Sequence, residues 1–246
     1  MLLPLEGRVA IVTGAGVRVG RAIAEALVDH GAHLVAHYRS SAEGAAQLVR
    51  RAAGLGRSAL AVQADLTDEK QRARLFAAAE TLGGCDLLVN SAAVFERRPL
   101  EEIDEAAWTR MLETNLTAPF FCCQAAAESM RRKGGGDIVN IVDVAGGLVA
   151  WPGYAHYCSA KAGLAMLTKC LALELAPAIR VNGVAPGPVL LPEGVGEAQT
   201  RRALARVPLG RTGSPEDVVR TVLFLLTGSS YLTGQLIAVD GGRSIA

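Results

Sequence analysis

Thr13-Gly14-Ala15-Gly16-Val17-Arg18-Val19-Gly20 ends an apolar run and leads straight into a helical pattern. A buried strand, a glycine-rich turn and a helix in this order open a β-α-β unit. Glycines let the backbone turn tightly and approach a pyrophosphate, which the N–H groups and dipole of the helix N-terminus stabilise. We expect a dinucleotide site here, although glycines in such a turn can also serve its geometry alone.

Short apolar runs continue to alternate with helical patterns as far as the C-terminus, without a repeat or a linker. Strands are predicted at residues 9–13, 33–38, 58–63, 87–90, 137–142, 180–185 and 236–239, and helices at 21–30, 42–53, 68–82, 105–132, 154–175 and 215–226. Most of these strands are continuous apolar runs, typical of parallel strands buried on both faces. The sequence therefore predicts one α/β domain over residues 1–246, a Rossmann-type doubly wound parallel sheet of about seven strands with helices on both faces.

The composition limits the classes of function. The chain has 246 residues, of which 50% are hydrophobic and 20% charged, as in a globular protein with a substantial core. Its 25 basic and 24 acidic residues give a net charge of +1, which leaves no field to attract nucleic acid or an anionic membrane. No apolar run is long enough to span a membrane. We expect a small-molecule substrate, and neither a nucleic acid nor a membrane as partner.

Cysteine and histidine usage indicates a cytoplasmic protein without a metal. The five cysteines form no C-x-x-C pair, and four of them lie in strongly apolar segments that resemble core. The four histidines are not at metal-ligand spacing on a helix. The first residues lack a charged region and are interrupted by Pro4, so they do not resemble a signal peptide.

The end of the second strand predicts which dinucleotide binds. A site for NAD would carry Asp or Glu there, but the sequence is Ala36-His37-Tyr38-Arg39-Ser40-Ser41, with no acidic residue before Glu43. A guanidinium can bind a 2′-phosphate bidentately, so Arg39 with Ser40 favours NADP(H). Arg18 can add a second positive charge at the phosphates. The alternative is that Arg39 is simply solvated in a surface loop.

Later strand ends supply further candidates. Asp65 can accept a hydrogen bond from the adenine amino group, or it can cap the following helix. Asn90-Ser91-Ala92 places small residues beside the cofactor. Phe95, a few positions further on, can wall the substrate pocket or pack as an ordinary core residue.

A tyrosine and a lysine suggest acid–base chemistry. Tyr157 and Lys161 are four residues apart, so both lie on one face of a predicted helix. A tyrosine has a pKa near ~10, and a neighbouring ammonium together with an oxidised nicotinamide favours the phenolate. The pair therefore predicts a phenol that transfers protons near neutral pH.

These features resemble the short-chain dehydrogenase/reductase family over nearly the whole chain. The matching positions also include Asn115 in a long helix, Pro186-Gly187, and Asp240-Gly241-Gly242. The resemblance implies that Tyr157 donates the proton, that Lys161 holds the nicotinamide ribose and lowers the tyrosine pKa, and that Asn115 supports a proton relay through water. It also implies a homotetramer. The cofactor contacts that it implies are Gly14, Arg18, Val19, His37, Tyr38, Arg39, Ser40, Asp65, Leu66, Asn90, Ser91, Ala92, Tyr157, Lys161, Pro186 and Gly187.

Two departures from the family pattern resemble the pteridine reductase subgroup. Arg18 stands where the glycine-rich turn usually has another glycine, and Asp143 replaces the usual serine after the fifth strand. The resemblance implies that Asp143 works with Tyr157 and Lys161, and that the stretch from His37 to Ser40 grips the 2′-phosphate. It further implies that Phe95 stacks a pterin against the nicotinamide. The alternative for Asp143 is a cap on the next turn. Fourteen positions separate it from Tyr157, one more than the family pattern, so the intervening loop must bulge.

The sequence therefore predicts an NADPH-dependent reductase that takes a dihydropterin or dihydrofolate to the tetrahydro form. Its substrate contacts would be Arg18, Phe95, Asp143, Tyr157 and Leu190, the last within a lid expected over residues 188–212. The first alternative is a carbonyl reductase of the same family, acting on a 3-oxoacyl thioester or a small ketone. A protein that binds NADP(H) as a sensor without turnover is the second.

Overall fold

The computed structural model describes residues 4–144, 148–190, 196, 201 and 204–246. Its centre is one sheet of seven strands in the order β3-β2-β1-β4-β5-β6-β7, and every neighbouring pair is parallel. The order reverses between β1 and β4, which is where a doubly wound sheet binds its ligands. The strands are β1 (Val9–Val12), β2 (His33–Tyr38), β3 (Ala59–Gln63), β4 (Leu87–Asn90), β5 (Gly136–Ile141), β6 (Ile179–Pro186) and β7 (Leu236–Val239).

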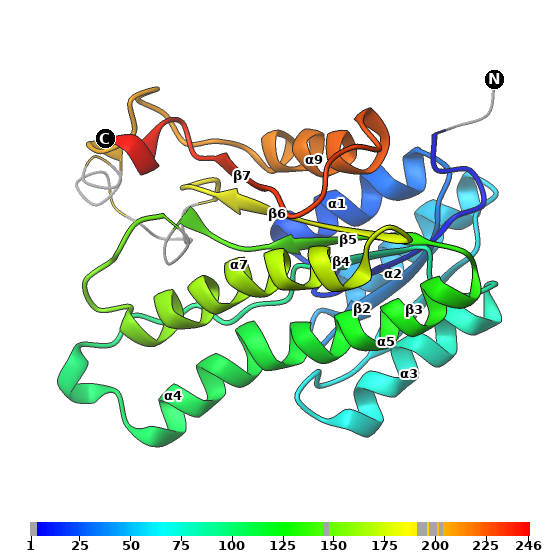
Figure 1. The fold of residues 1–246 in the computed structure, drawn as a ribbon, viewed down its shortest axis with the longest axis horizontal. Helices are drawn as coiled ribbons and strands as arrows, with labels where there is room; N and C mark the ends of the chain where they lie inside the picture. Colours follow the sequence, from blue (N-terminus) through cyan, green and yellow to red (C-terminus); the bar gives the residue numbers. More distant parts are fainter. Residues whose placement is uncertain (1–3, 145–147, 191–195, 197–200, 202–203) are drawn as a thin grey trace.

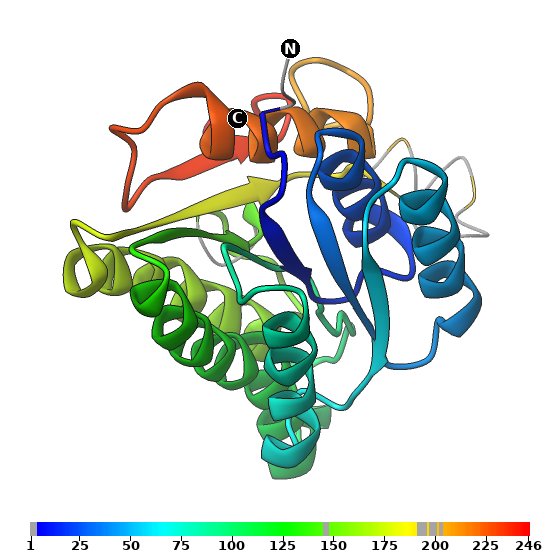
Figure 2. The same cartoon turned by 90° about the vertical axis from the view of Figure 1, so that its right-hand side faces the viewer.

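Helices cover both faces of the sheet, and Figure 2 shows the sheet between the two layers. One layer holds α1 (Arg18–Asp29), α2 (Ala42–Gly54) and α9 (Pro215–Leu223), and the other holds α3 (Glu69–Thr81), α4 (Glu105–Leu112), α5 (Ala118–Arg132) and α7 (Ala155–Leu175). Each layer buries its own apolar core against the sheet, with Leu27 and Leu34 in one and Leu75 and Leu88 in the other. The predicted doubly wound α/β domain is confirmed.

The predicted helix over residues 105–132 is interrupted once. A π turn, η2 (Glu113–Thr117), joins α4 to α5, and Pro119 lies at the start of α5. A second π turn, η3 (Phe224–Gly228), follows α9, which ends at Leu223 rather than Leu226. Two short 3-10 helices, η1 (Leu100–Glu102) and η4 (Arg243–Ile245), complete the described elements. π turns often occur at functional sites, and η2 contains Asn115.

Two expectations about burial need correction. The edge strand β3 is largely exposed, with Leu60 at 38%, because an edge strand is covered by fewer neighbours than a central one. Only Cys85, Cys122 and Cys123 of the five cysteines are buried; Cys158 is half-buried and Cys170 is exposed. The last two lie on α7, whose sequence is apolar around most of its circumference, so the pattern does not reveal its outer face.

The carboxyl end of β5, the N-terminal end of α7 and the C-terminus lie on the same side of the molecule (Figure 1). Within the described ranges, no helix combines the length and the apolar character that crossing a membrane requires. Nor do three His, Cys, Asp or Glu side chains of those residues gather as metal ligands.

Candidate active site

The glycine-rich turn lies between β1 and the N-terminus of α1. Gly14 has a φ of +67°, and a Cβ at this position would be 2.9 Å from the Cα of Ala92. A Cβ at Gly20 would be 2.3 Å from the carbonyl oxygen of Gly14. Val17, which precedes α1, supplies no side-chain cap. The turn is therefore packed against the end of β4 with the first N–H groups of the helix available, which is what a dinucleotide phosphate requires.

Arg18 connects this turn to the segment after β6. Its φ of 53° is the only positive value for a non-glycine residue in the described part of the chain. This conformation favours glycine and costs about 1–3 kcal/mol for other residues. The Arg18 guanidinium donates a 2.7 Å hydrogen bond to the carbonyl oxygen of Leu190. The structure thus brings together Arg18 and Leu190, which were both predicted to contact the substrate, whereas half of the expected lid beyond Leu190 lies outside the described residues.

His37 differs from its expected role. The side chain is 2% exposed, its Nδ1 accepts a 3.0 Å hydrogen bond from the Gly14 amide, and its Nε2 lies 3.0 Å from the carbonyl oxygen of Ala64. Burial lowers the pKa of His37, so the ring is neutral and donates from Nε2. Because both nitrogens are used inside the protein, His37 holds the turn against β2 and β3 rather than gripping a 2′-phosphate.

Arg39 and Asp65 face each other at the far end of the cleft. The Arg39 guanidinium is 3.2 Å from a carboxylate oxygen of Asp65, and the Arg39 side chain is 65% exposed. Hydrogen bonds from Thr67 hold the pKa of Asp65 below its usual value. Asp68 caps α3, since its carboxylate accepts from the Gln71 amide, so the alternative role of Asp65 as helix cap is wrong. Arg39 is therefore positioned at the open end of the cleft.

A cavity of about 700 Å³ joins these features into one cleft. It runs along the carboxyl ends of β1, β2, β3 and β4, as expected for a Rossmann-type sheet. The predicted contacts that line it are Gly14, Arg18, Val19, His37, Tyr38, Arg39, Ser40, Asp65, Leu66, Ser91, Ala92 and Phe95.

Three predicted cofactor residues have other surroundings. The Asn90 side chain is buried and donates a 2.9 Å hydrogen bond to Asn140 of β5, so it faces the sheet rather than the cleft. Pro186 ends β6, and the Gly187 amide donates to Val239 of β7. A Cβ at Gly187 would be 2.8 Å from Asp240, which explains the glycine without a cofactor.

Tyr157, Lys161 and Asp143 meet beside the end of β5. The Tyr157 hydroxyl donates a 2.8 Å hydrogen bond to Oδ2 of Asp143, although fourteen residues separate them. The Lys161 ammonium donates to the carbonyl oxygen of Ile141 at 2.8 Å and lies 5.9 Å from the centre of the Tyr157 ring. The predicted group is therefore assembled. Residues 145–147, in the loop expected to bulge, are outside the described ranges.

The electrostatics of this group differ from the sequence prediction. The pKa of Tyr157 is raised well above its usual value, first by burial and then by the negative charge of Asp143. Burial lowers the pKa of Lys161 to about 8, and Asp143 offsets part of that effect. Lys161 donates to Ile141 while Asp143 contacts the phenol, and the effect of Lys161 together with a nicotinamide on the tyrosine pKa remains a prediction. Tyr157 is held in its protonated form.

Asn115 has a structural task that the sequence did not reveal. Its side chain is fully buried in η2, and its Nδ2 donates to the carbonyl oxygens of Val94 and Met111, both at 3.0 Å. Its Oδ1 accepts from the Val94 amide at 3.2 Å. Asn115 thereby fixes the segment that carries Phe95. The proton relay that the resemblance implied remains a prediction.

Phe95 belongs to an aromatic cluster. Its ring stacks on Tyr154 at 4.8 Å between centroids and contacts Tyr157 edge-on at 4.9 Å, and Trp151 lies 6.3 Å away. The side chain is nevertheless 51% exposed. One face of Phe95 is thus already used by Tyr154, and the rest is open to a substrate. No sequence motif singles out Tyr154, which lies three residues before Tyr157 and so on nearly the same side of the chain.

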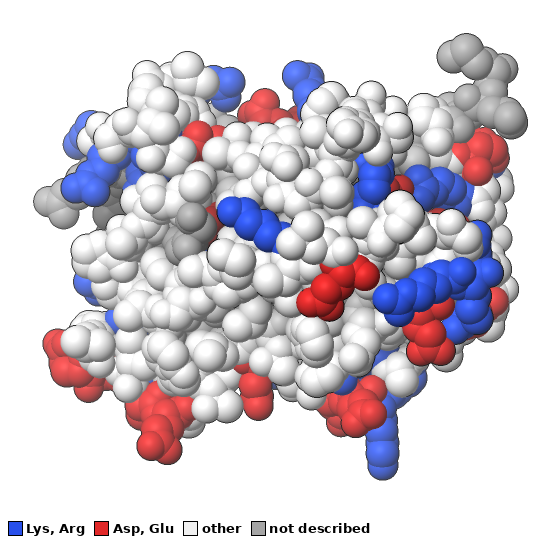
Figure 3. All heavy atoms as spheres, viewed as in Figure 1, with Lys and Arg blue, Asp and Glu red and all other residues white. Residues whose placement is uncertain are grey.

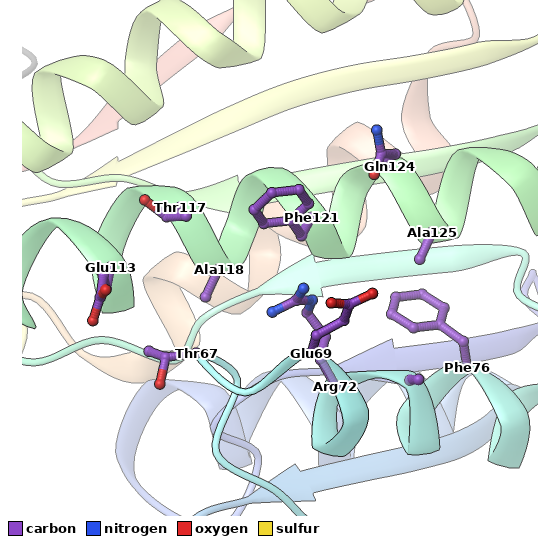
Figure 4. A pocket seen from close by; sticks show the side chains of 11 residues that line it. Thr67, Glu69, Arg72, Phe76, Glu113, Thr117, Ala118, Phe121, Gln124 and Ala125 are labelled. Carbon is purple, nitrogen blue, oxygen red and sulfur yellow. The ribbon is translucent and has the colours of Figure 1, made fainter.

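A separate cleft of about 470 Å³ lies between α3 and α5 (Figure 4). Arg72 is 9% exposed there, donates a 2.7 Å hydrogen bond to the carbonyl oxygen of Leu66, and lies 4.8 Å from the Phe121 ring centre. No predicted catalytic residue lines this cleft. Its contribution to the site is that Arg72 fixes Leu66, which borders the cofactor cleft.

Comparison with known proteins identifies the family. Residues 14–244 match the family described as enoyl-(acyl carrier protein) reductase. The 3beta-hydroxysteroid dehydrogenase 1 of Eggerthella lenta is 38% identical over 249 residues, which cover 98% of this chain and 95% of that protein. The 3-oxoacyl-(acyl-carrier-protein) reductase of Staphylococcus aureus is 36% identical over 238 residues, or 95% and 96% of the two chains.

A solved structure shares both fold and sequence. The 7 alpha-hydroxysteroid dehydrogenase complexed with NADH and 7-oxo glycochenodeoxycholic acid has a TM-score of 0.91 and 32% identity, covering 97% of this chain and 94% of that one. These relatives are named for steroid and acyl substrates and not for pterins. They therefore support membership of the family but not of the pteridine reductase subgroup. The chain therefore belongs to the short-chain dehydrogenase/reductase family, whose members are oxidoreductases that use NAD(P)(H).

Proposed function

We propose that this protein is an NADPH-dependent carbonyl reductase that converts a small ketone or a 3-oxoacyl compound into the corresponding alcohol. The observation that carries the proposal is the protonated Tyr157 beside Lys161, in contact with Phe95 and Ile141, which line the cofactor cleft. The relatives named for hydroxysteroids and 3-oxoacyl substrates support a carbonyl as the reacting group. They favour this alternative over the pterin that the sequence suggested.

The chain's own residues supply the proton in this proposal. When bound, NADPH supplies the hydride. Tyr157 turns its O–H from Asp143 to the carbonyl oxygen and donates the proton, which its raised pKa keeps in place at neutral pH. The Lys161 ammonium stabilises the resulting phenolate, which would otherwise be repelled by the carboxylate of Asp143. Asp143 orients the phenol before the transfer.

The choice of NADPH over NADH rests on the end of β2. Arg39 lies at the rim of the cleft with its guanidinium largely exposed, and Ser40 is next to it. The carboxylate that would accept from a ribose 2′-hydroxyl is missing between His37 and Ser41. A bidentate contact between Arg39 and a 2′-phosphate would replace the 3.2 Å ion pair with Asp65.

Asp143 favours a second candidate, reduction of a C=N bond in a dihydropterin. A carboxylate accepts hydrogen bonds and does not donate them, so it suits a substrate with ring N–H groups better than a carbonyl oxygen that gains negative charge. Phe95, 51% exposed, offers a face for a flat ring. Under this candidate Asp143→Ser abolishes pterin reduction. Under the carbonyl proposal the same change leaves an active ketone reductase.

A homotetramer remains part of the proposal. The face formed by α4, α5 and α7 carries few charged side chains near its centre (Figure 3). Large apolar side chains are exposed on these three helices, namely Trp108, Phe120, Phe121, Met166 and Leu173. Apolar helical faces of this kind are typical of contacts between copies of one chain.

The experiment that tests the function is NADPH oxidation by the purified protein. The substrates are cyclohexanone, an acetoacetyl thioester and 7,8-dihydrobiopterin, each repeated with NADH, and Tyr157→Phe is the control for background oxidation. Turnover of a carbonyl substrate that depends on Tyr157 supports the proposal. Turnover of the dihydropterin alone replaces it with the second candidate. Tight NADPH binding without turnover of any substrate would instead support a protein that binds NADP(H) as a sensor.

A further inference from the structure

The β3–α3 loop, a name we give to residues 64–67, forms one wall of the cofactor cleft. All four of its residues line the cavity of about 700 Å³. A carboxylate oxygen of Asp65 in this loop lies 3.2 Å from the guanidinium of Arg39. Arg39 is the proposed contact of the 2′-phosphate, a group that belongs to the adenosine half of NADPH. Under the proposed function, the β3–α3 loop therefore borders the adenosine half of the cofactor.

Two side chains from the first turn of α3 hold this loop. The Oε1 atom of Gln71 accepts a 2.9 Å hydrogen bond from the Asp65 amide. The Arg72 guanidinium donates a 2.7 Å hydrogen bond to the carbonyl oxygen of Leu66. Among the described residues, this carbonyl oxygen accepts no other hydrogen bond. Since Leu66 is buried, loss of Arg72 would leave a buried carbonyl without a partner, which favours a different loop conformation.

Arg72 links the loop to a second helix. Its side chain, only 9% exposed, reaches from α3 toward α5, where the guanidinium carbon lies 4.8 Å from the centre of the Phe121 ring (Figure 4). Burying a guanidinium is costly unless its contacts replace water, and here the Leu66 carbonyl and the ring face do so. Because α3 and α5 both pack against the sheet, Arg72 fastens the β3–α3 loop to the rigid part of the fold.

We propose that Arg72 is a positioning residue for the cofactor, which holds the β3–α3 loop in the conformation that the adenosine half of NADPH binds. The inference rests on the NADPH binding of the proposed function and not on its carbonyl substrate. Without the bond from Arg72 to Leu66, only a fraction of the molecules has the loop in this conformation. The apparent Kd for the cofactor then rises by the inverse of that fraction. The reaction at Tyr157 is unchanged once the cofactor is bound.

The test measures two affinities and one rate. The Kd for NADPH comes from fluorescence titration, the Kd for adenosine 2′,5′-bisphosphate, which lacks the nicotinamide half, from calorimetry, and kcat for ketone reduction is taken at saturating NADPH. The variants are Arg72→Met and Arg72→Lys, and the matched control is Arg74→Met, an exposed arginine of the same helix. Phe121→Leu removes the ring that contacts the guanidinium and leaves the bond to Leu66 in place, so it serves as the test if Arg72→Met does not fold. Urea unfolding reports whether each variant is folded.

We expect Arg72→Met to raise both Kd values by about tenfold, the size of one charge-assisted hydrogen bond, and to keep kcat. Arg72→Lys should recover part of the affinity, Phe121→Leu should raise both Kd values by about two- to fivefold, and Arg74→Met should change neither. Unchanged Kd values in the folded Arg72→Met or Phe121→Leu variant, or an equal rise in Arg74→Met, would overturn the inference. If the wild type reduces no carbonyl while Arg72→Met still weakens binding of adenosine 2′,5′-bisphosphate, the proposed function is refuted and the inference stands.

Discussion

Replacing Asp143 by asparagine tests how the chain controls the proton on Tyr157. The carboxylate accepts the 2.8 Å hydrogen bond of a phenol that is 4% exposed. Its negative charge favours the protonated phenol and so raises the pKa of Tyr157. The Asp143→Asn variant would keep a hydrogen-bond acceptor of the same shape and remove the charge. The pKa of Tyr157 should therefore fall.

The magnitude follows from the type of hydrogen bond. A bond to a charged group contributes about 1.5–3 kcal/mol and a neutral bond about 0.5–1.5 kcal/mol, so the difference is about 1–1.5 kcal/mol. Since 1.36 kcal/mol corresponds to one pKa unit, the shift is about one pH unit. Loss of Asp143 also removes the charge that raises the pKa of Lys161, so the ammonium is lost at lower pH as well. Because both pKa values fall, the variant should lose activity at a lower alkaline pH than the wild type does.

The assay is the pH dependence of kcat for NADPH-dependent ketone reduction, which reports groups in the substrate complex. The alkaline limb of the Asp143→Asn variant should lie about one pH unit below that of the wild type. Glu113→Gln removes a negative charge from an exposed residue of η2 and should leave the limb in place. An unchanged alkaline limb, or one that moves to higher pH, would refute the reasoning that Asp143 holds the proton on Tyr157.

Three further predictions concern the cofactor, the acid and the buried lysine. Arg39→Ala should raise the Kd for NADPH by about 10- to 100-fold and change that for NADH much less, because only NADPH carries the 2′-phosphate; equal losses in fluorescence titrations would remove Arg39 from the phosphate site. Tyr157→Phe should lower kcat by about 10²- to 10⁴-fold while NADPH binding is kept, and an unchanged kcat would show that another group is the acid. Lys161→Met should stabilise the cofactor-free protein relative to the wild type below pH 8. Folding lowers the pKa of Lys161 from 10.5 to about 8, so at a pH below 8 the wild-type protein must bury a charged ammonium, which lowers its free energy of unfolding. The gain in the free energy of unfolding is at most about 3 kcal/mol, reduced by the loss of the hydrogen bond to Ile141, and it should disappear as the pH rises from 8 to 10.5. Urea unfolding measures this free energy for both proteins, and an equal difference between them at pH 8 and pH 10.5 would contradict the prediction.

The architecture of the sheet can be predicted from the sequence. Continuous apolar runs at regular intervals predict the strands of a parallel sheet, and their boundaries agree with the structure to within one or two residues, although the edge strand β3 is largely exposed. The spacing of Tyr157 and Lys161 also predicts that they lie together, because residues four apart on a helix share a face whatever the tertiary structure. Arg39 could be placed at the cleft because it follows β2, and the carboxyl ends of parallel strands lie at the same edge of the sheet, where the cleft forms.

Contacts between residues that are distant in sequence could not be predicted in this way. His37 lies close to Arg39 in sequence, yet its ring turns inward to hold the Gly14 amide, an orientation that the packing of β1, β2 and β3 selects. Asp143 raises the pKa of Tyr157, an effect that depends on burial and on a 2.8 Å contact between segments fourteen residues apart. Arg243 reaches the segment before α7 from the other end of the chain. Sequence periodicity reports the local face of a helix or strand, whereas charge, burial and long-range contacts arise when separate elements pack together.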